Sequence, residues 1–146
     1  KFDNGAKGIL HASQISIGQE NNLAIWVFGE KASLEWHQEN PNYLKFYKPD
    51  SPVQIFSRGN DYIAEKSPAA GRATRIPFGH PEAFIEAFAN IYCNFADTLS
   101  AKLSGEQPDE LAEDFPTAED GLRGMLFLDT VVESARSESK WTEFKK

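Results

Sequence analysis

The sequence is poor in the residues that most often build covalent or metal-bound sites. Its single cysteine, Cys93, excludes an internal disulfide, and the apolar residues around it indicate a buried, inert thiol rather than a nucleophile. The three histidines, His11, His37 and His80, are far apart, and no HExxH or CxxC pattern is present, so we expect no metal site. One cysteine leaves the redox compartment open but favours the cytoplasm, where we expect the protein.

Long apolar runs and an excess of positive charge are also missing. No run approaches the roughly 18 apolar residues that span a bilayer, and no basic stretch followed by an apolar one marks a signal peptide. The net charge of −7 disfavours nucleic acid and anionic membrane surfaces as partners, since both need clustered Lys and Arg. What is present is ordinary for a globular protein: 146 residues, 40% of them hydrophobic and 25% charged.

Alternating apolar and polar residues predict strands in the first half of the chain. Asp3-Asn4-Gly5 is a hairpin turn signal, and a long strand is expected after it at residues 6–17. Residues 23–28 are apolar on both faces, which predicts a central strand covered on both sides. Further strands are expected at residues 32–39, 43–47 and 53–57, followed by a surface loop at residues 58–75.

Two helices are expected in the second half. Residues 76–103 contain a turn and then the longest helical pattern, with Pro81 fitting the first helical position and Glu82 the first turn. An apolar stripe on this helix should pack on the sheet; it consists of Phe84, Ala87, Phe88, Ile91, Phe95 and Leu99. After an acidic loop at residues 104–115, Thr117 is the expected N-cap of a helix that runs to about Ser137, and a short strand is expected at residues 141–144.

These elements predict an α+β fold: an open, largely antiparallel sheet with two main helices packed on one face. The other face should be available for oligomer or domain packing, because a monomer rarely exposes a large contiguous apolar patch. We expect residues 1–146 to be a single domain. We also expect it to be truncated at its N-terminus, since only Lys1 and Phe2 precede the first hairpin turn.

Five polar residues are candidate substrate contacts. His80 and Glu82 lie side by side at the start of the long helix, where His80 could contact a substrate hydroxyl or relay a proton, or could be a local structural group. Ser13 and Gln14 lie in mid-strand and could line a site or satisfy the sheet. Asn42 belongs to an Asn-Pro-Asn segment that is turn chemistry by itself.

The ordered motifs resemble a known family. NGAKGILHASQISIGQENNLAIWVFGEKASLEWHQENPN, then IPFGHPEAFIEAFANIY, then DFPTAEDGLRGMLFLDTVVESARSESKW together are similar to the C-terminal domain of the glucose–fructose oxidoreductase / inositol dehydrogenase / MocA family. The resemblance covers nearly the whole chain. The sequence departs from the family pattern at three positions: Ala32 stands where glycine is usual, and Ala83 and Phe84 stand where Gly-Tyr often follows the glutamate.

The resemblance implies a larger enzyme of which this chain is one part. In that family an N-terminal Rossmann domain binds NAD or NADP, and the C-terminal domain shapes the site for a sugar- or polyol-like substrate and makes the oligomer contact. This chain lacks the G-x-G-x-x-G fingerprint, the E-K-P lysine motif and the D-x-x-x-H pair, so no cofactor-binding or catalytic residue is expected within it. The expected partners are its own Rossmann domain, a second copy bound through the sheet face, and a carbohydrate-like molecule. The alternative is a non-catalytic, stand-alone binding domain.

Overall fold

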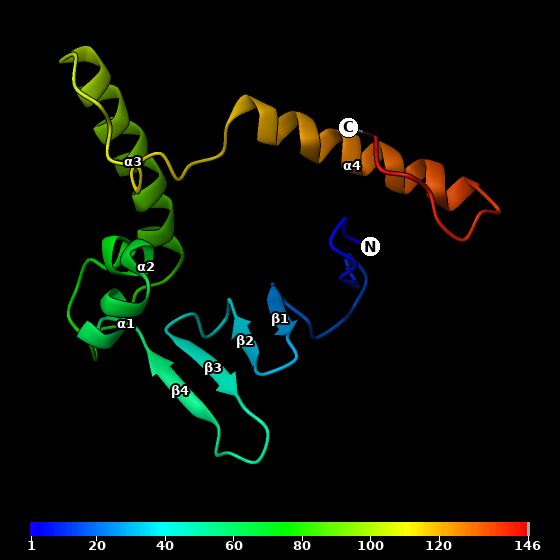
Figure 1. The fold of residues 1–146 in the computed structure, drawn as a ribbon, viewed down its shortest axis with the longest axis horizontal. Coiled ribbons are helices and arrows are strands. Elements are labelled where there is room, and N and C mark those ends of the chain that lie inside the picture. Colours follow the sequence, from blue (N-terminus) through cyan, green and yellow to red (C-terminus); the bar gives the residue numbers. More distant parts are fainter. Residues whose placement is uncertain (146) are drawn as a thin grey trace.

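A four-stranded antiparallel sheet and four helices make up the fold. The computed structural model describes residues 1–145. The strands pair in sequence order and are β1 (Ala24–Phe28), β2 (Ser33–His37), β3 (Tyr43–Tyr47) and β4 (Gln54–Ser57). The helices are α1 (Asp61–Lys66), α2 (Pro68–Ala73), α3 (Phe84–Leu103) and α4 (Ala118–Arg136) (Figure 1). The predicted α+β class with an open antiparallel sheet is therefore confirmed.

The strand register separates the sheet into a polar and an apolar face. Glu35 of β2 lies opposite Trp26 of β1 and Lys45 of β3, so these three residues share one side, which we call the Glu35 face. The alternate residues form the opposite side, the Phe56 face. It carries Ile25, Val27, Leu34, Trp36, Leu44, Phe46 and Phe56. The ring of Tyr62 in α1 contacts Phe56, which places α1 on the Phe56 face.

The segment predicted as a surface loop at residues 58–75 contains two short helices instead. Ser67 ends α1 and begins α2, where its side chain accepts a hydrogen bond from the Ala70 N–H at 3.3 Å and Pro68 follows at the first helical position. A Cβ atom at Gly71 would lie 2.8 Å from the Cβ of Ala64, so glycine is what lets the two helices approach. The Gly, Pro and Ala content that indicated a loop thus serves a helix junction.

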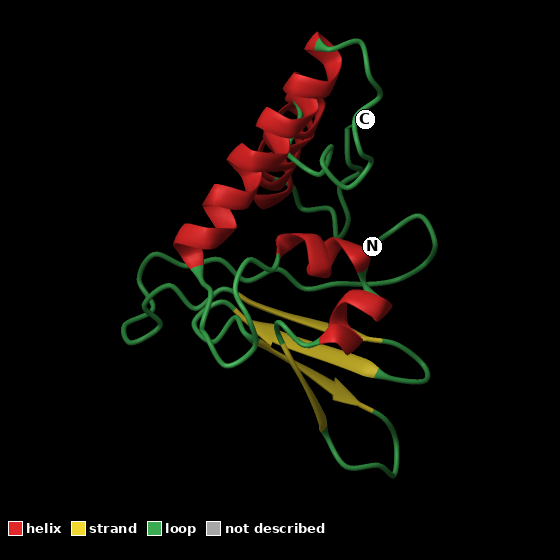
Figure 2. Cartoon of the chain, turned by 90° about the vertical axis from the view of Figure 1, so that its left-hand side faces the viewer, coloured by secondary structure: helices red, strands yellow, loops and turns green. Residues whose placement is uncertain are grey.

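The long helix α3 begins at Phe84, not at Pro81 as predicted. Ala83 is the N-cap residue, and its methyl side chain cannot accept a hydrogen bond from the first turn. The Glu86 carboxylate accepts the Ala83 N–H at 2.9 Å. The expected packing of the α3 stripe on the sheet is not found: α3 extends away from the sheet (Figures 1 and 2). Part of the stripe contacts the acidic loop, where the rings of Phe95 and Phe115 meet at 5.7 Å. The physical reason is that an amphipathic stripe specifies an apolar partner without specifying which one.

Helix α4 starts where the sequence predicts. The Thr117 hydroxyl accepts the Asp120 N–H at 3.2 Å, and the Asp120 carboxylate accepts the Thr117 N–H at 3.0 Å, which is a reciprocal capping arrangement. The helix lies apart from the sheet, and the C-terminal segment returns alongside it (Figure 1). The strand expected at residues 141–144 is wrong, because this segment lies beside a helix rather than beside a strand with which it could pair.

The strand expected at residues 6–17 is also not formed. The turn before it exists: Gly5 has a φ of 88°, and the Phe2 N–H donates to the Ala6 carbonyl at 2.9 Å. The residues that follow make only local hydrogen bonds among residues 1–145, and their alternate apolar side chains, such as Ile9 and Ile17, are fully exposed. Alternation marks a segment that suits a sheet, but a strand also needs a neighbour for its backbone groups.

The buried interior is small. Ala112 is the one buried hydrophobic residue among those described, and large apolar side chains are exposed on the sheet, on α3 and on α4. Within residues 1–145, none of the helices combines the length and the apolar composition that crossing a bilayer requires. We therefore look for functional side chains in local hydrogen-bond networks rather than around a central cavity.

Candidate functional site

A network of side-chain and backbone polar groups lies where β4 ends and the chain approaches α3. Arg58 follows the last residue of β4, and its guanidinium reaches the loop at residues 76–82, which precedes α3. Three of the five predicted site residues, Asn42, His80 and Glu82, are brought together here by the fold. Arg58 itself was missed, because it was assigned to the start of a surface loop.

All five N–H donors of the Arg58 guanidinium have acceptors in this network. Nε donates to Asn42 Oδ1 at 2.9 Å, and Nη1 donates to the Ile76 carbonyl at 2.9 Å and to a carboxylate oxygen of Glu82. Nη2 donates to the carbonyls of Pro77, at 3.2 Å, and His80. A planar guanidinium with fixed donor directions therefore determines the path of the loop before α3.

The two predicted residues Glu82 and Asn42 complete this network from the other side. Glu82 is buried, with 7% of its surface exposed, and its Oε1 accepts the N–H groups of Arg75 at 2.7 Å and Ile76 at 3.1 Å. Asn42 Oδ1 accepts the Glu82 N–H at 3.0 Å in addition to its bond from Arg58. Glu82 thus lies before α3 and binds Arg58, rather than sitting in the first turn of the helix as predicted.

The side chain of His80, unlike those of Glu82 and Asn42, does not bind Arg58. Its backbone carbonyl is held by Arg58, but its ring is exposed, and Nδ1 lies 3.3 Å from the Phe78 carbonyl. A carbonyl oxygen can only accept, so Nδ1 is the donor in this contact and the neutral ring keeps Nε2 as an acceptor. The loop therefore presents one side chain with an acceptor toward solvent.

Ser13 and Gln14 do not join this group. They precede β1, at the opposite edge of the sheet from β4 and Arg58. The Ser13 hydroxyl accepts the Ile15 N–H at 3.3 Å and is bonded to the Ser16 hydroxyl at 2.7 Å, so its contacts are local. The structure therefore divides the predicted site residues between two edges of the sheet.

A second polar network, on the Glu35 face, was not predicted. The Glu35 carboxylate accepts hydrogen bonds from Lys45 Nζ at 2.7 Å and from the Tyr47 hydroxyl at 2.5 Å, and it lies 2.8 Å from His37 Nε2. The edge of the His37 ring also meets the ring of Trp26 at 5.3 Å. The alternation of residues 32–39 placed Glu35 and His37 on one side, but Lys45 and Tyr47 join them only through the register of β3.

Hydrogen bonding strongly stabilises the ionised form of Glu35. The Lys45 ammonium, followed by the Tyr47 hydroxyl and His37, lowers the pKa of Glu35 from 4.5 to about 2. The same contacts raise the pKa of Lys45 and the pKa of Tyr47, since each is hydrogen-bonded to the Glu35 carboxylate. These groups are matched to one another in their charged or protonated forms, which indicates a structural cluster rather than an acid–base pair.

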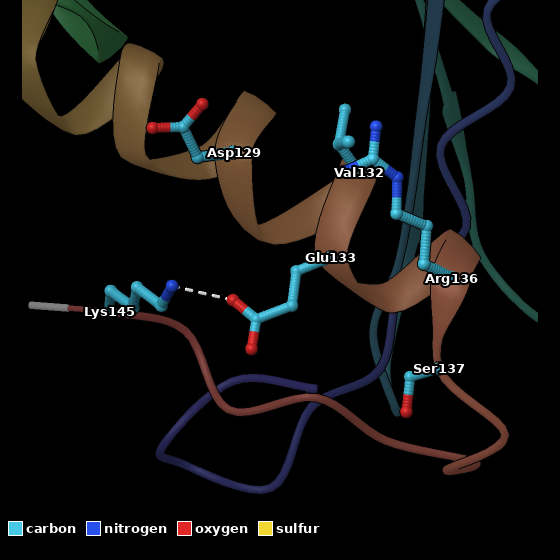
Figure 3. Close-up of a pocket in the computed structure, with 6 residues that line it drawn as sticks. All are labelled: Asp129, Val132, Glu133, Arg136, Ser137 and Lys145. Atoms are coloured by element: carbon cyan, nitrogen blue, oxygen red, sulfur yellow. Dashed lines mark ion pairs between the residues drawn. The ribbon is translucent and has the colours of Figure 1, made fainter.

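Helix α4 and the C-terminal segment border an open depression (Figure 3). It is lined by Asp129, Val132, Glu133, Arg136, Ser137 and Lys145. Lys145 Nζ lies 2.5 Å from the Glu133 carboxylate, and this ion pair raises the pKa of Lys145. Two of its charged residues, Glu133 and Lys145, are thus paired with each other, and none of the predicted site residues lies here.

The described residues do not fit a nicotinamide cofactor. Such a cofactor places its pyrophosphate at the N-terminus of a helix that follows a strand and a Gly-rich turn in a parallel sheet. Here every strand pair is antiparallel, and the Arg58-Gly59-Asn60 connection from β4 leads into a helix of only six residues. Residues 1–145 also contain no group of three or more His, Cys, Asp or Glu side chains arranged to hold a metal ion.

Sequence comparison connects the chain to known proteins. The family model for the "Oxidoreductase family, C-terminal alpha/beta domain" matches residues 1–144. The chain is also 33% identical, over 99% of its length, to the uncharacterized oxidoreductase YfiI of Bacillus subtilis. It spans only 36% of that relative.

Solved structures show the same relationship. An oxidoreductase from Sinorhizobium meliloti is 41% identical and superposes with a TM-score of 0.78 over 90% of this chain and 35% of its own. An inositol dehydrogenase homolog from Azotobacter vinelandii, complexed with NAD+, is 35% identical with a TM-score of 0.72 over 83% of this chain and 30% of its own. The predicted family is confirmed: the chain belongs to the oxidoreductase family as its C-terminal α/β domain, the C-terminal domain of the glucose–fructose oxidoreductase / inositol dehydrogenase / MocA proteins.

Proposed function

We propose that this chain is the substrate-side domain of an NAD(P)-dependent oxidoreductase that acts on a hydroxyl group of a sugar or polyol. The observation that carries the proposal is the family match over residues 1–144. It is supported by 35% identity to the Azotobacter vinelandii inositol dehydrogenase homolog, whose structures are complexed with NAD+ or with NADH and myo-inositol. The chain spans about a third of these relatives, so the activity belongs to a longer protein.

The proposal divides the work between two parts of that protein. The cofactor is bound outside this chain, because the antiparallel sheet offers no Gly-rich turn for a pyrophosphate. This chain contributes His80, whose exposed ring can accept a hydrogen bond from a substrate hydroxyl. Glu82 and Asn42 support the loop that carries His80, and Ser13 and Gln14 line a second edge if the segment before β1 closes on the substrate.

The Glu35 face is the proposed contact with a second copy of the protein. Its central charges are already bonded to one another, so another sheet could cover them without stranding a charge. Exposed aromatic side chains border them, including Trp26, Tyr43 and Phe28, of which Phe28 is 79% exposed. Aromatic residues are enriched at protein interfaces relative to the rest of the surface. Light scattering of the full-length protein should give a multiple of the monomer mass, and Trp26→Glu should reduce it.

The experiment that tests the enzymatic proposal uses the full-length protein. Binding of NAD+ and NADP+ is measured by calorimetry, and formation of reduced cofactor is then followed with myo-inositol and a panel of sugars and polyols. Micromolar binding of one cofactor together with oxidation of at least one polyol is expected. Absence of nicotinamide binding would contradict the proposal.

The second candidate is a binding domain without redox chemistry. The observation that favours it is the satisfied state of the polar clusters around Glu35 and Arg58, neither of which holds an acid–base pair. A carbohydrate that binds the full-length protein without any oxidation would support this alternative. In either case we propose a cytoplasmic protein, since the single cysteine offers no internal disulfide for an oxidising compartment to form.

A further inference from the structure

We propose that Arg58 is a positioning residue that fixes the loop at residues 76–82 so that His80 presents Nε2 to a substrate hydroxyl. The identity of the ligand rests on the proposed function. The positioning itself rests on the contacts of Arg58, and the two can fail separately.

Arg58 holds the backbone of the loop at two points. Its Nη1 binds the carbonyl of Ile76 where the loop begins, and its Nη2 binds the carbonyl of His80 itself. The Arg58 side chain is largely buried, with 17% of its surface exposed. The orientation of His80 is therefore linked to the end of β4 through a single guanidinium group.

The carboxylate of Glu82 and the amide oxygen of Asn42 are already engaged in hydrogen bonds within the protein. Both carboxylate oxygens of Glu82 accept hydrogen bonds, one from Arg58 and the other from the N–H groups of Arg75 and Ile76. Asn42 Oδ1 accepts two more. Of the three residues that the sequence singled out here, only His80 keeps a side chain turned outward.

Backbone packing against Gly59 leaves the loop little freedom. Gly59, next to Arg58, has a φ of 80°, and a Cβ atom at this position would lie 2.8 Å from the backbone nitrogen of Phe78. Only glycine permits that approach without strain. Because the carbonyl of Phe78 is also the acceptor for His80 Nδ1, the same contact helps to set the tautomer of the ring.

The steady-state test uses Arg58→Lys, which keeps the charge but not the planar set of five donors. In the full-length protein, we expect the KM for the hydroxyl substrate to rise about tenfold with a smaller change in kcat, and the affinity for the nicotinamide cofactor to stay unchanged. His80→Gln should raise KM by a similar factor. The KM of the double variant should be no higher than that of either single variant, since both substitutions remove the same interaction. Additive effects of the two substitutions would overturn the proposal.

A matched control separates positioning from general destabilisation. Arg72 on α2 also makes three side-chain contacts, with Asn94, Asp97 and Asp109, but none with the loop before α3. Arg72→Lys should leave KM unchanged. If Arg58→Lys does not fold, Gly59→Ala disturbs the same loop while keeping the guanidinium, and it should produce the same rise in KM. An equal rise in Arg72→Lys would overturn the proposal.

A spectroscopic test does not depend on turnover. In protein labelled with ¹⁵N-histidine and assigned with His80→Gln, the ring nitrogens of His80 should show the Nδ1–H tautomer at neutral pH, and Arg58→Lys should shift them toward a mixture. If this shift occurs in a protein that oxidises no polyol, the positioning stands and the proposed function fails. If the ring signals of His80 are the same in both proteins, the positioning fails whatever the protein catalyses.

Discussion

At the scale of single residues, Arg58 and Glu82 show how a charge pair can organise a loop without being a catalytic pair. Taking two charges out of water is costly, so such a pair is weak evidence for net stability. Removing one partner is different, because the remaining charge then stays buried without compensation. The ion pair therefore specifies one conformation of the loop. Its loss should be detectable as a decrease in the free energy of unfolding.

Replacing Glu82 with alanine should destabilise the full-length protein by about 3 kcal/mol. The substitution leaves the Arg58 guanidinium without its carboxylate and the N–H groups of Arg75 and Ile76 without an acceptor. Urea denaturation followed by circular dichroism measures the change. Glu113→Gln is the matched control: its exposed pair with Lys102 Nζ, at 3.5 Å, should contribute less than about 1 kcal/mol. Equal losses in the two variants would contradict the assignment.

The Glu35 cluster makes stability depend on pH in a defined window. The pKa of Glu35 is about 2 in the folded protein and 4.5 ordinarily, so its ionised form stabilises the fold above pH 4.5. As pH falls from 4.5 toward 2, the unfolded state binds the proton first, and this contribution is lost. The stability difference between wild type and Glu35→Gln should therefore shrink across that range. Denaturation at pH 6, 4.5 and 3 tests this, and a difference that stays constant would show that the carboxylate is not the cause.

At the scale of elements, the sequence predicted best where the signal and its partner are neighbours in the chain. The Thr117 cap needs only Asp120, and the hairpins of β1 to β4 need only their turns, so these were predicted nearly to the residue. Arg58 meets its partners 16 to 24 positions away, through side-chain contacts that no periodicity encodes. The strand expected at residues 6–17 failed for the related reason that a strand requires a neighbour that its own pattern cannot supply.

The cap of α4 gives a prediction about this one element. Thr117→Ala removes the acceptor for the Asp120 N–H and should cost about 1 kcal/mol, with fraying of the first turn of α4. Thr117→Ser keeps the oxygen and should be close to neutral. Hydrogen exchange at the first turn of the helix, compared between the two variants in the full-length protein, measures the effect. Equal exchange in both would mean that packing rather than the cap holds this end of α4.

At the scale of the whole molecule, the exposed apolar surface and the family relationship have a common explanation. The stripes of α3 and α4 and part of the Phe56 face are uncovered within residues 1–145. The chain nevertheless superposes with a TM-score of 0.78 on a solved oxidoreductase of which it spans 35%. The open arrangement is thus shared with a relative whose remaining two thirds can cover such surfaces. We infer that these surfaces are internal in the longer protein.

That inference predicts how the segment before β1 behaves in the full-length protein. Between Ile9 and Ile17 the backbone has only local hydrogen bonds, and alone it should exchange its amide hydrogens almost as fast as an unfolded chain. Once it is paired in a larger sheet, its amides should be protected at least on the order of 10³-fold, because exchange then requires opening that sheet. The exposed turn between β3 and β4, at residues 48–52, is the internal control and should stay unprotected in the same protein. Exchange as fast in residues 9–17 as in this turn would show that the segment has no strand partner in the longer protein, and that its apolar alternation serves a different contact.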